Sequence, residues 1–142
     1  MIIKRIFHIF IIFSIFTACK NTVEEVPSYT QDGIASYYAD FFQGKPTASG
    51  ELFFQDSLTA AHMYLPLGTE VKVVNLENDS SVTVTINDRG PYVADRIIDL
   101  SKAAAVQLDM VEQGTTEVRV KVTSPADGYT LMDSIAIDRV GK

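Results

Sequence analysis

The chain has 142 residues, 46% of them hydrophobic and 21% charged, and its formal net charge is −6. This length is enough for one domain with one hydrophobic core and too short for two ordinary domains. The acidic balance argues against a strong nucleic-acid binder, which needs a basic face to neutralise phosphates. We therefore expect one acidic domain and no nucleic-acid partner.

The beginning of the chain has the organisation of a signal peptide. Lys4 and Arg5 supply positive charge, and the apolar run over residues 6–16 is too short to span a bilayer comfortably. Ala18 then precedes Cys19, the only cysteine, so no intrachain disulfide can form. This pattern resembles a bacterial lipoprotein signal, which implies cleavage before Cys19 and lipid attachment to its sulfur. An ordinary signal peptide followed by an incidental thiol is the alternative.

A polar segment without periodicity, residues 20–30, follows the cysteine and predicts that residues 19–32 form a tether between lipid and domain. Gly33 is expected to open the domain. Removal of residues 1–18 would also remove His8, so any histidine chemistry would depend on His62.

Short runs with alternating apolar residues dominate the remaining sequence and predict strands. The expected strands cover residues 33–38, 71–73, 81–87 and 117–122. A loop rich in Gly and Pro (41–51), an apolar segment (58–69) and a hairpin-like turn (75–80) lie between them.

One helix is predicted late in the chain, in the segment "DLSKAAAVQLDM" (residues 99–110). Ser101 is its expected N-cap, Ala104 and Leu108 share a face, and Gly114 is expected to end it. Parallel α/β winding needs repeated crossover helices, and this pattern lacks them. The sequence therefore predicts a small, mostly β barrel with one short helix.

Three polar residues on separate segments could carry chemistry together. Glu51 follows "TASG", His62 closes "LTAAH" and Asp88 ends the strand "SVTVTIND". Cleavage of a glycosidic bond needs a proton donor and a second group that accepts a proton or stabilises charge. Simpler interpretations stay open, because Asp88 has a turn-like setting, His62 lies in an apolar segment and Glu51 follows a loop. The usual zinc ligand sets and phosphate-binding loops are missing from the sequence.

Four longer motifs occur in a characteristic order and carry a family resemblance. They are "GIASYYADFFQGKPTASGELF", "LTAAHMYLPLGTEVKVVNLEN", "VTINDRGPYVADRIIDLSKAAAVQL" and "VRVKV". Together they resemble the rare lipoprotein A family, over about residues 33–122. The resemblance implies a six-stranded double-psi β-barrel with one short helix. It also implies endolytic lytic transglycosylase activity on peptidoglycan, with a preference for glycan strands stripped of stem peptides.

The resemblance also assigns roles to individual residues. Asp88 corresponds to the acid/base, and Glu51 and His62 complete the catalytic group by positioning substrate and tuning Asp88. The residues expected to bind substrate are Arg89, Thr47, Tyr37 and Asp56. Arg89 would clamp a carboxylate or contact the muramic lactyl group. No metal or cofactor is implied.

One position departs from the family pattern. Phe54 stands where the family usually has Asp or Asn, three residues after Glu51. Asp56 would lie on the same side of an extended segment and could substitute.

These observations give an expected organisation of the chain. It comprises a lipoprotein signal peptide (1–18), a lipid-anchored tether (19–32), the barrel (33–123) and a tail (124–142) without the sporulation-related repeat domain. The expected partners are peptidoglycan glycan strands and, through Cys19, a membrane. We expect a monomer in the bacterial envelope, on the outer membrane and facing the periplasm. A non-catalytic, expansin-like glycan-binding lipoprotein and a glycoside hydrolase are the alternatives.

Overall fold

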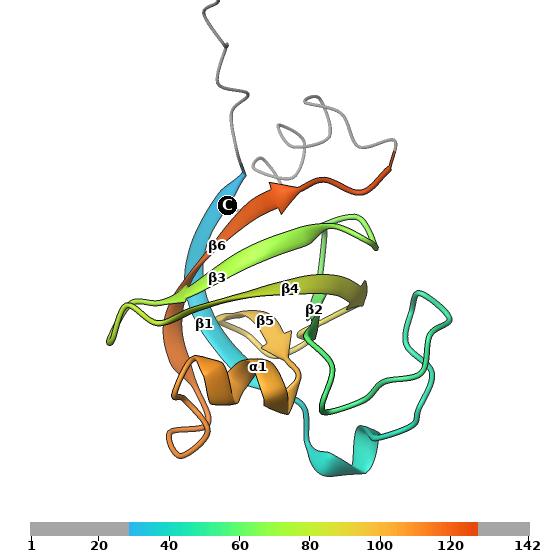
Figure 1. Ribbon diagram of the computed structural model, residues 1–142, viewed down its shortest axis with the longest axis horizontal. Helices are drawn as coiled ribbons and strands as arrows, with labels where there is room; N and C mark the ends of the chain where they lie inside the picture. Colours follow the sequence, from blue (N-terminus) through green and yellow to red (C-terminus); the bar gives the residue numbers. More distant parts are fainter. Residues whose placement is uncertain (1–28, 128–142) are drawn as a thin grey trace, which may run out of the picture.

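A computed structural model describes residues 29–127 and shows a closed barrel of six strands with one α-helix at its end (Figure 1). The elements are β1 (Thr30–Tyr37), a 3₁₀ turn (Asp40–Phe42), β2 (Thr59–His62), β3 (Glu70–Asn75), β4 (Ser81–Asp88), β5 (Arg96–Leu100), α1 (Lys102–Gln107) and β6 (Thr116–Ser124). No helix between residues 29 and 127 is long and apolar enough to cross a membrane.

The barrel mixes parallel and antiparallel neighbours in the order β1-β5-β2-β4-β3-β6. β1 runs parallel to β5, and β2 runs parallel to β4, whereas the other neighbours are antiparallel. This is the double-psi arrangement, so the predicted fold class is confirmed.

Alternation along the longer strands fills the barrel interior. The inward residues of β3, β4 and β6 are at most 4% exposed: Val71, Val73, Val82, Val84, Ile86, Val118 and Val120. Their outward neighbours, such as Lys72 and Arg119, are exposed. The period-two pattern in the sequence therefore identified most of the core correctly.

The barrel begins earlier than expected, because β1 starts at Thr30 and not at Gly33. Residues 30–32 pair with residues 119–121 of β6, and Asp32 accepts two hydrogen bonds from the Arg119 guanidinium, of 2.8 and 2.7 Å. The last three residues of the expected tether are thus part of the sheet. The predicted signal peptide, Cys19 and the tail beyond residue 127 lie outside the described residues.

The helix is shorter than expected at its C-terminal end. Ser101 caps its start by accepting a hydrogen bond from the Ala104 backbone N–H, as predicted. It ends at Gln107, because Asp109 adopts a left-handed φ of 52° and the chain turns there, well before Gly114. Leu108, the C-terminal cap, is fully buried against the barrel end.

Two neighbouring apolar residues at the end of α1 allow a test of this packing. Leu108→Ala should lower the free energy of unfolding by about 2–5 kcal/mol, because it leaves a cavity beneath the barrel. Val106 is 60% exposed, so Val106→Ala should change the free energy of unfolding by less than about 1 kcal/mol. Chemical denaturation of both variants measures the difference. Equal losses would contradict the described packing.

Candidate active site

A β-bulge on β4 directs Asp88 out of the barrel. The parallel register pairs Ala60 with Ile86 and Ala61 with Asp88, so Asn87 is an extra residue on β4. Strict alternation would have placed Asp88 on the same face as Ile86, inside the core. The bulge changes the face, which is a common role of bulges beside functional sites. Asp88 is consequently half-buried on the outer surface of the barrel.

Three hydrogen-bond donors surround the Asp88 carboxylate. The Tyr38 hydroxyl donates to Oδ2 at 2.6 Å, and the backbone N–H groups of Ala48 and Arg89 donate to Oδ1 at 2.9 Å each. These donors come from the end of β1, from the β1–β2 connection and from Asp88's own neighbour. The carboxylate is therefore fixed by parts of the chain that are distant in sequence.

The "TASGE" segment is a tight loop that places Glu51 beside the bulge. Thr47 uses both its N–H and its hydroxyl to bond the Glu51 carbonyl, at 2.8 Å each. Ser49 N–H donates to the Asn87 carbonyl at 3.0 Å, and the Asn87 side-chain amide donates to Glu51 Oε2 at 3.3 Å. Asn87 thus links the Glu51 and Asp88 positions. Thr47 is 8% exposed and serves the loop, so its geometry gives no support to the predicted substrate contact.

An open pocket of about 380 Å³ adjoins this loop. It is lined by Glu51, Leu52, Phe54, Ser57, Thr59 and Asn87. Phe54 therefore lines the same pocket as Glu51 and is 43% exposed.

The prediction that Asp56 shares a side with Phe54 is wrong. Residues 54–57 form a turn, closed by a hydrogen bond from Ser57 N–H to the Phe54 carbonyl at 3.2 Å, and not an extended segment. Asp56 is exposed and does not line the pocket, so it does not occupy the position where the family pattern has Asp or Asn.

His62 is buried in the barrel, with 1% of its surface exposed. Its Nδ1 accepts hydrogen bonds from the backbone N–H groups of Tyr64 and Leu65, so Nε2 carries the proton and donates to Gln31 Oε1 at 3.1 Å. Burial, together with the charge of Arg89, lowers the pKa of His62 to about 4. The ring is therefore neutral near pH 7 and has both nitrogens engaged, which favours a positioning role over direct proton transfer.

Arg89 connects Asp88 to the His62 turn. One guanidinium nitrogen donates to the backbone carbonyls of His62 at 3.2 Å and of Leu65 at 2.8 Å. The carboxylate clamp anticipated from the sequence is replaced here by a clamp on backbone carbonyls. Arg89 holds the chain that follows β2 against the end of β4.

Of the two adjacent tyrosines, Tyr38 and not Tyr37 lies at the site. Tyr37 points inward and donates its hydroxyl to the Val111 carbonyl at 3.1 Å. Tyr38 packs its ring on Phe53, with centroids 4.3 Å apart, and its pKa is raised by burial and by the bond to Asp88. Strand alternation separates the faces of the two tyrosines, but it does not reveal which face carries the site.

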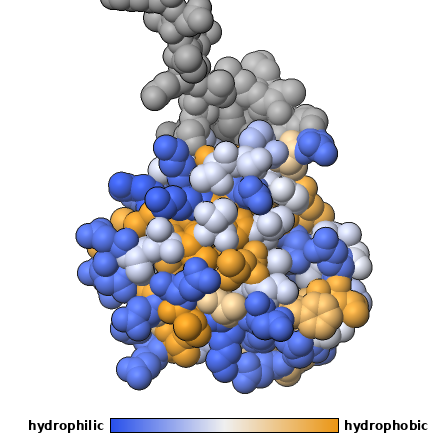
Figure 2. Space-filling view, viewed as in Figure 1, coloured by the Kyte–Doolittle hydropathy of each residue, from blue (hydrophilic) through white to orange (hydrophobic). Residues whose placement is uncertain are grey.

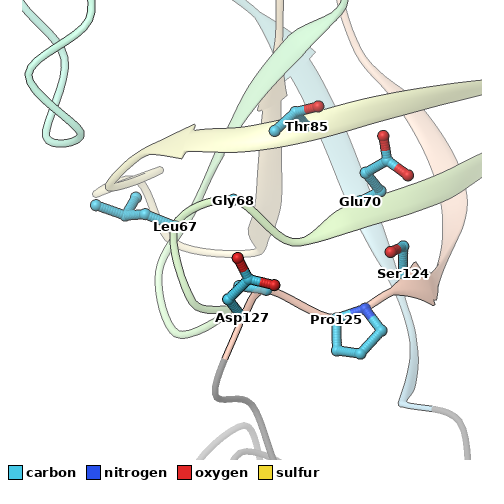
Figure 3. A pocket seen from close by; sticks show the side chains of 8 residues that line it. Leu67, Gly68, Glu70, Thr85, Ser124, Pro125 and Asp127 are labelled. Carbon is cyan, nitrogen blue, oxygen red and sulfur yellow. The ribbon is translucent and has the colours of Figure 1, made fainter.

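A second, larger pocket of about 480 Å³ lies between the start of β3 and the end of β6 (Figure 3). Glu70, Thr85, Ser124 and Asp127 line it, and none of the predicted site residues does. The space-filling view shows apolar side chains at the surface between groups of hydrophilic ones (Figure 2). Within residues 29–127, no group of three His, Cys, Asp or Glu side chains could hold a metal ion.

The fold brings Asp88, Glu51 and the Tyr38 hydroxyl together through the bulge, while the His62 ring lies in the core and Asp56 lies apart. Fold and site define a double-psi β-barrel with a carboxylate-bearing outer face. Residues 30–120 match the family model described as lytic transglycolase, and the chain belongs to that family.

Curated relatives carry the same domain within longer proteins. A Campylobacter jejuni protein named endolytic peptidoglycan transglycosylase RlpA is 57% identical over 93 residues, which cover 66% of this chain and 34% of that protein. A Treponema pallidum protein named probable endolytic peptidoglycan transglycosylase RlpA is 55% identical over 94 residues, covering 66% and 30%. The chain thus spans about a third of the length of these relatives. The resemblance to the rare lipoprotein A family is confirmed.

Solved structures agree with the barrel assignment. Streptomyces papain inhibitor superposes with a TM-score of 0.55 at 23% identity, covering 66% of this chain and 94% of that one. The apo expansin of Clavibacter michiganensis gives 0.52 at 20% identity, covering 71% and 54%. At these identities the likeness shows the fold alone.

The buried His62 predicts how stability depends on pH. An unfolded histidine titrates near 6.5, and the folded one near 4, so the unfolded chain takes up a proton first as the pH falls. Stability should therefore drop between pH 6.5 and 4, by up to about 3 kcal/mol from this residue. Denaturation at several pH values should show a shallower dependence for His62→Gln than for the wild type. Identical slopes would contradict the assignment.

Proposed function

We propose that this chain is a peptidoglycan lytic transglycosylase. It would cleave the bond between N-acetylmuramic acid and N-acetylglucosamine and leave a 1,6-anhydro end. The observation that carries the proposal is the placement of Asp88, which the β4 bulge turns outward, among three fixed donors and beside the Glu51 pocket. Membership of the lytic transglycolase family and the names of the relatives support the same activity.

The reaction requires acid and base chemistry but no water. An acid protonates the glycosidic oxygen, and the muramic 6-hydroxyl then attacks its own anomeric carbon while a base removes the hydroxyl proton. Asp88 is proposed as the acid/base, with Tyr38 holding the orientation of its carboxylate. Glu51, in the adjoining pocket, is placed to contact substrate. His62 and Arg89 act as positioning residues, because both hold the turn that follows β2, and Arg89 joins this turn to the end of β4.

The finer features are proposals of the same kind. We propose that glycan strands without stem peptides are the preferred substrate, and that the chain works as a monomer without a cofactor. Anchoring through lipid on Cys19, on the outer membrane facing the periplasm, follows from the signal-like sequence of residues 1–19. The relatives' names support action on envelope peptidoglycan.

Replacement of the acid/base tests the activity directly. Asp88→Asn should lower the rate by about 10²–10⁴-fold, because a positioned acid/base contributes that factor. The assay digests purified denuded glycan strands and counts anhydro-muramic ends by mass spectrometry. Asp79→Asn, in the exposed β3–β4 turn, is the matched control and should retain the wild-type rate.

Two results would contradict this proposal. Strands that bind to the wild type without yielding products would favour the expansin-like alternative. Reducing ends that carry an oxygen from ¹⁸O-water would identify a hydrolase.

The Tyr38 hydroxyl should contribute to catalysis through Asp88. Tyr38→Phe removes the bond to Oδ2, and bonds to charged groups are worth about 1.5–3 kcal/mol, so kcat should fall by roughly 10–100-fold with KM little changed. Tyr64→Phe is the control, since Tyr64 is 45% exposed and the substitution keeps both its edge-on ring contact with His62 and its backbone N–H bond to Nδ1. A change in KM alone would show that Tyr38 acts on binding and not on Asp88.

A further inference from the structure

A second aspartate shares the outer face with Asp88. The strand registers align Asp99 of β5 with Ala61 of β2, and Ala61 with Asp88 of β4. Paired residues of neighbouring strands point to the same face, and strands lie about 4.8 Å apart, so the two aspartate Cα atoms are separated by roughly 10 Å. Ala61 is the residue that lies between them in the strand register. The barrel therefore presents two carboxyl groups on either side of a small residue.

The Asp99 carboxylate is only partly satisfied: its Oδ2 accepts a hydrogen bond from the Arg96 guanidinium, whereas its Oδ1 has no partner among the described residues. Oδ1 is inaccessible to solvent, and the distance from Oδ2 to the Arg96 guanidinium is 3.4 Å. Buried polar atoms in folded proteins are nearly always hydrogen-bonded, and the exceptions often belong to functional sites. The side chain as a whole keeps 18% exposure, so it is reachable from solvent.

A second unpartnered group lies on the same face. Thr59, two residues before Ala61 on β2, points to the same side, and its buried hydroxyl also lacks a hydrogen-bond partner among the described residues. Thr59 lines the pocket that contains Glu51. Thr59 and Asp99 thus lie on the same outer face, Thr59 at the Glu51 pocket on β2 and Asp99 on the neighbouring β5.

We infer that Asp99 is a second catalytic carboxylate, the group that protonates the glycosidic oxygen, while Asp88 accepts the proton of the attacking hydroxyl. This inference rests on the proposed function and divides between two residues the roles first given to Asp88 alone. All three polar contacts of Asp88 are donated to its oxygens, an environment suited to a proton acceptor.

The surroundings of Asp99 suit a proton donor. Burial raises its pKa, and the charge of Arg96 opposes this only in part. The other titratable groups of this cluster are Tyr38, which directly follows β1, Tyr92 and Asp88 of β4, while β2 contributes only Ala61 and Thr59. Two carboxyl groups in contrasting environments are the usual basis for separate acid and base roles.

The proton and electron balance closes. The Asp99 proton goes to the glycosidic oxygen, which keeps the electron pair of the broken C1–O bond and leaves as the alcohol of N-acetylglucosamine. The muramic O6 forms the new bond to C1, and its proton passes to Asp88. One proton then returns from Asp88 to Asp99 through solvent before the next cycle.

The choice of leaving group distinguishes an acid from a structural residue. On natural strands, Asp99→Asn should lower the rate of anhydro-end formation by about 10²-fold or more. On an aryl β-glycoside of a muramic-acid-ended fragment, whose phenolate departs without protonation, the same variant should be within about 10-fold of the wild type. Asp88→Asn should be slower than the wild type on both substrates. The control Asp79→Asn should match the wild type on both.

The outcomes distinguish failure of the Asp99 role from failure of the proposed function. Equal losses on both substrates, or no loss on either, would overturn the role of Asp99 and leave the proposed function standing. Absence of anhydro ends with the wild type would overturn the proposed function itself. Should Asp99→Asn show no cooperative thermal transition, the wild-type pH profile serves instead. The rate should then fall as the pH rises through the raised pKa of Asp99, and a profile without this alkaline limb would contradict the inference.

Discussion

The extra residue on β4 is the constraint on which the site depends. Asn87 breaks the alternation of an otherwise regular strand, so Ile86 still closes the core while Asp88 faces outward. The same residue anchors the "TASGE" loop through its carbonyl and holds Glu51 through its amide. One inserted residue thus satisfies two demands that strict alternation would oppose, a filled barrel and an exposed carboxylate.

A polar layer inside the molecule supports this corner. His62 uses both ring nitrogens to fix the turn after β2 and to reach Gln31 on β1, and Arg89 bonds two carbonyls of the same turn. Buried polar groups of this kind are stable only when they are satisfied, so the network holds the geometry around Asp88 and costs stability when it is broken. Asp99 Oδ1 and Thr59 Oγ1, by contrast, are buried and have no hydrogen-bond partner among the described residues.

Much of the barrel could be predicted from local sequence, but the short strands could not. β3, β4 and β6 show clear alternation of apolar and polar residues, and Ser101 has the residue type of a helix N-cap. β2 has four residues, and β5 has the sequence "RIIDL", which gives too little periodicity to assign. The site was predicted in the same uneven way. Motifs indicate Asp88 and Glu51 as candidates, whereas they point to Tyr37 and not to Tyr38. The expected extended segment at Asp56 is a turn.

The sequence by itself determined the class of fold and the family, because alternating burial and long motifs can be recognised locally along the chain. It offered Asp88 and Glu51 as candidate site residues but not Asp99. Only the tertiary structure decided which residues meet. Asp88 and Asp99 come from β4 and β5 and Tyr38 from the residue after β1, and their relation depends on register, on the bulge at Asn87 and on the closure of the barrel. These are properties of pairing between distant segments, and a one-residue shift in register would move each side chain to the other face.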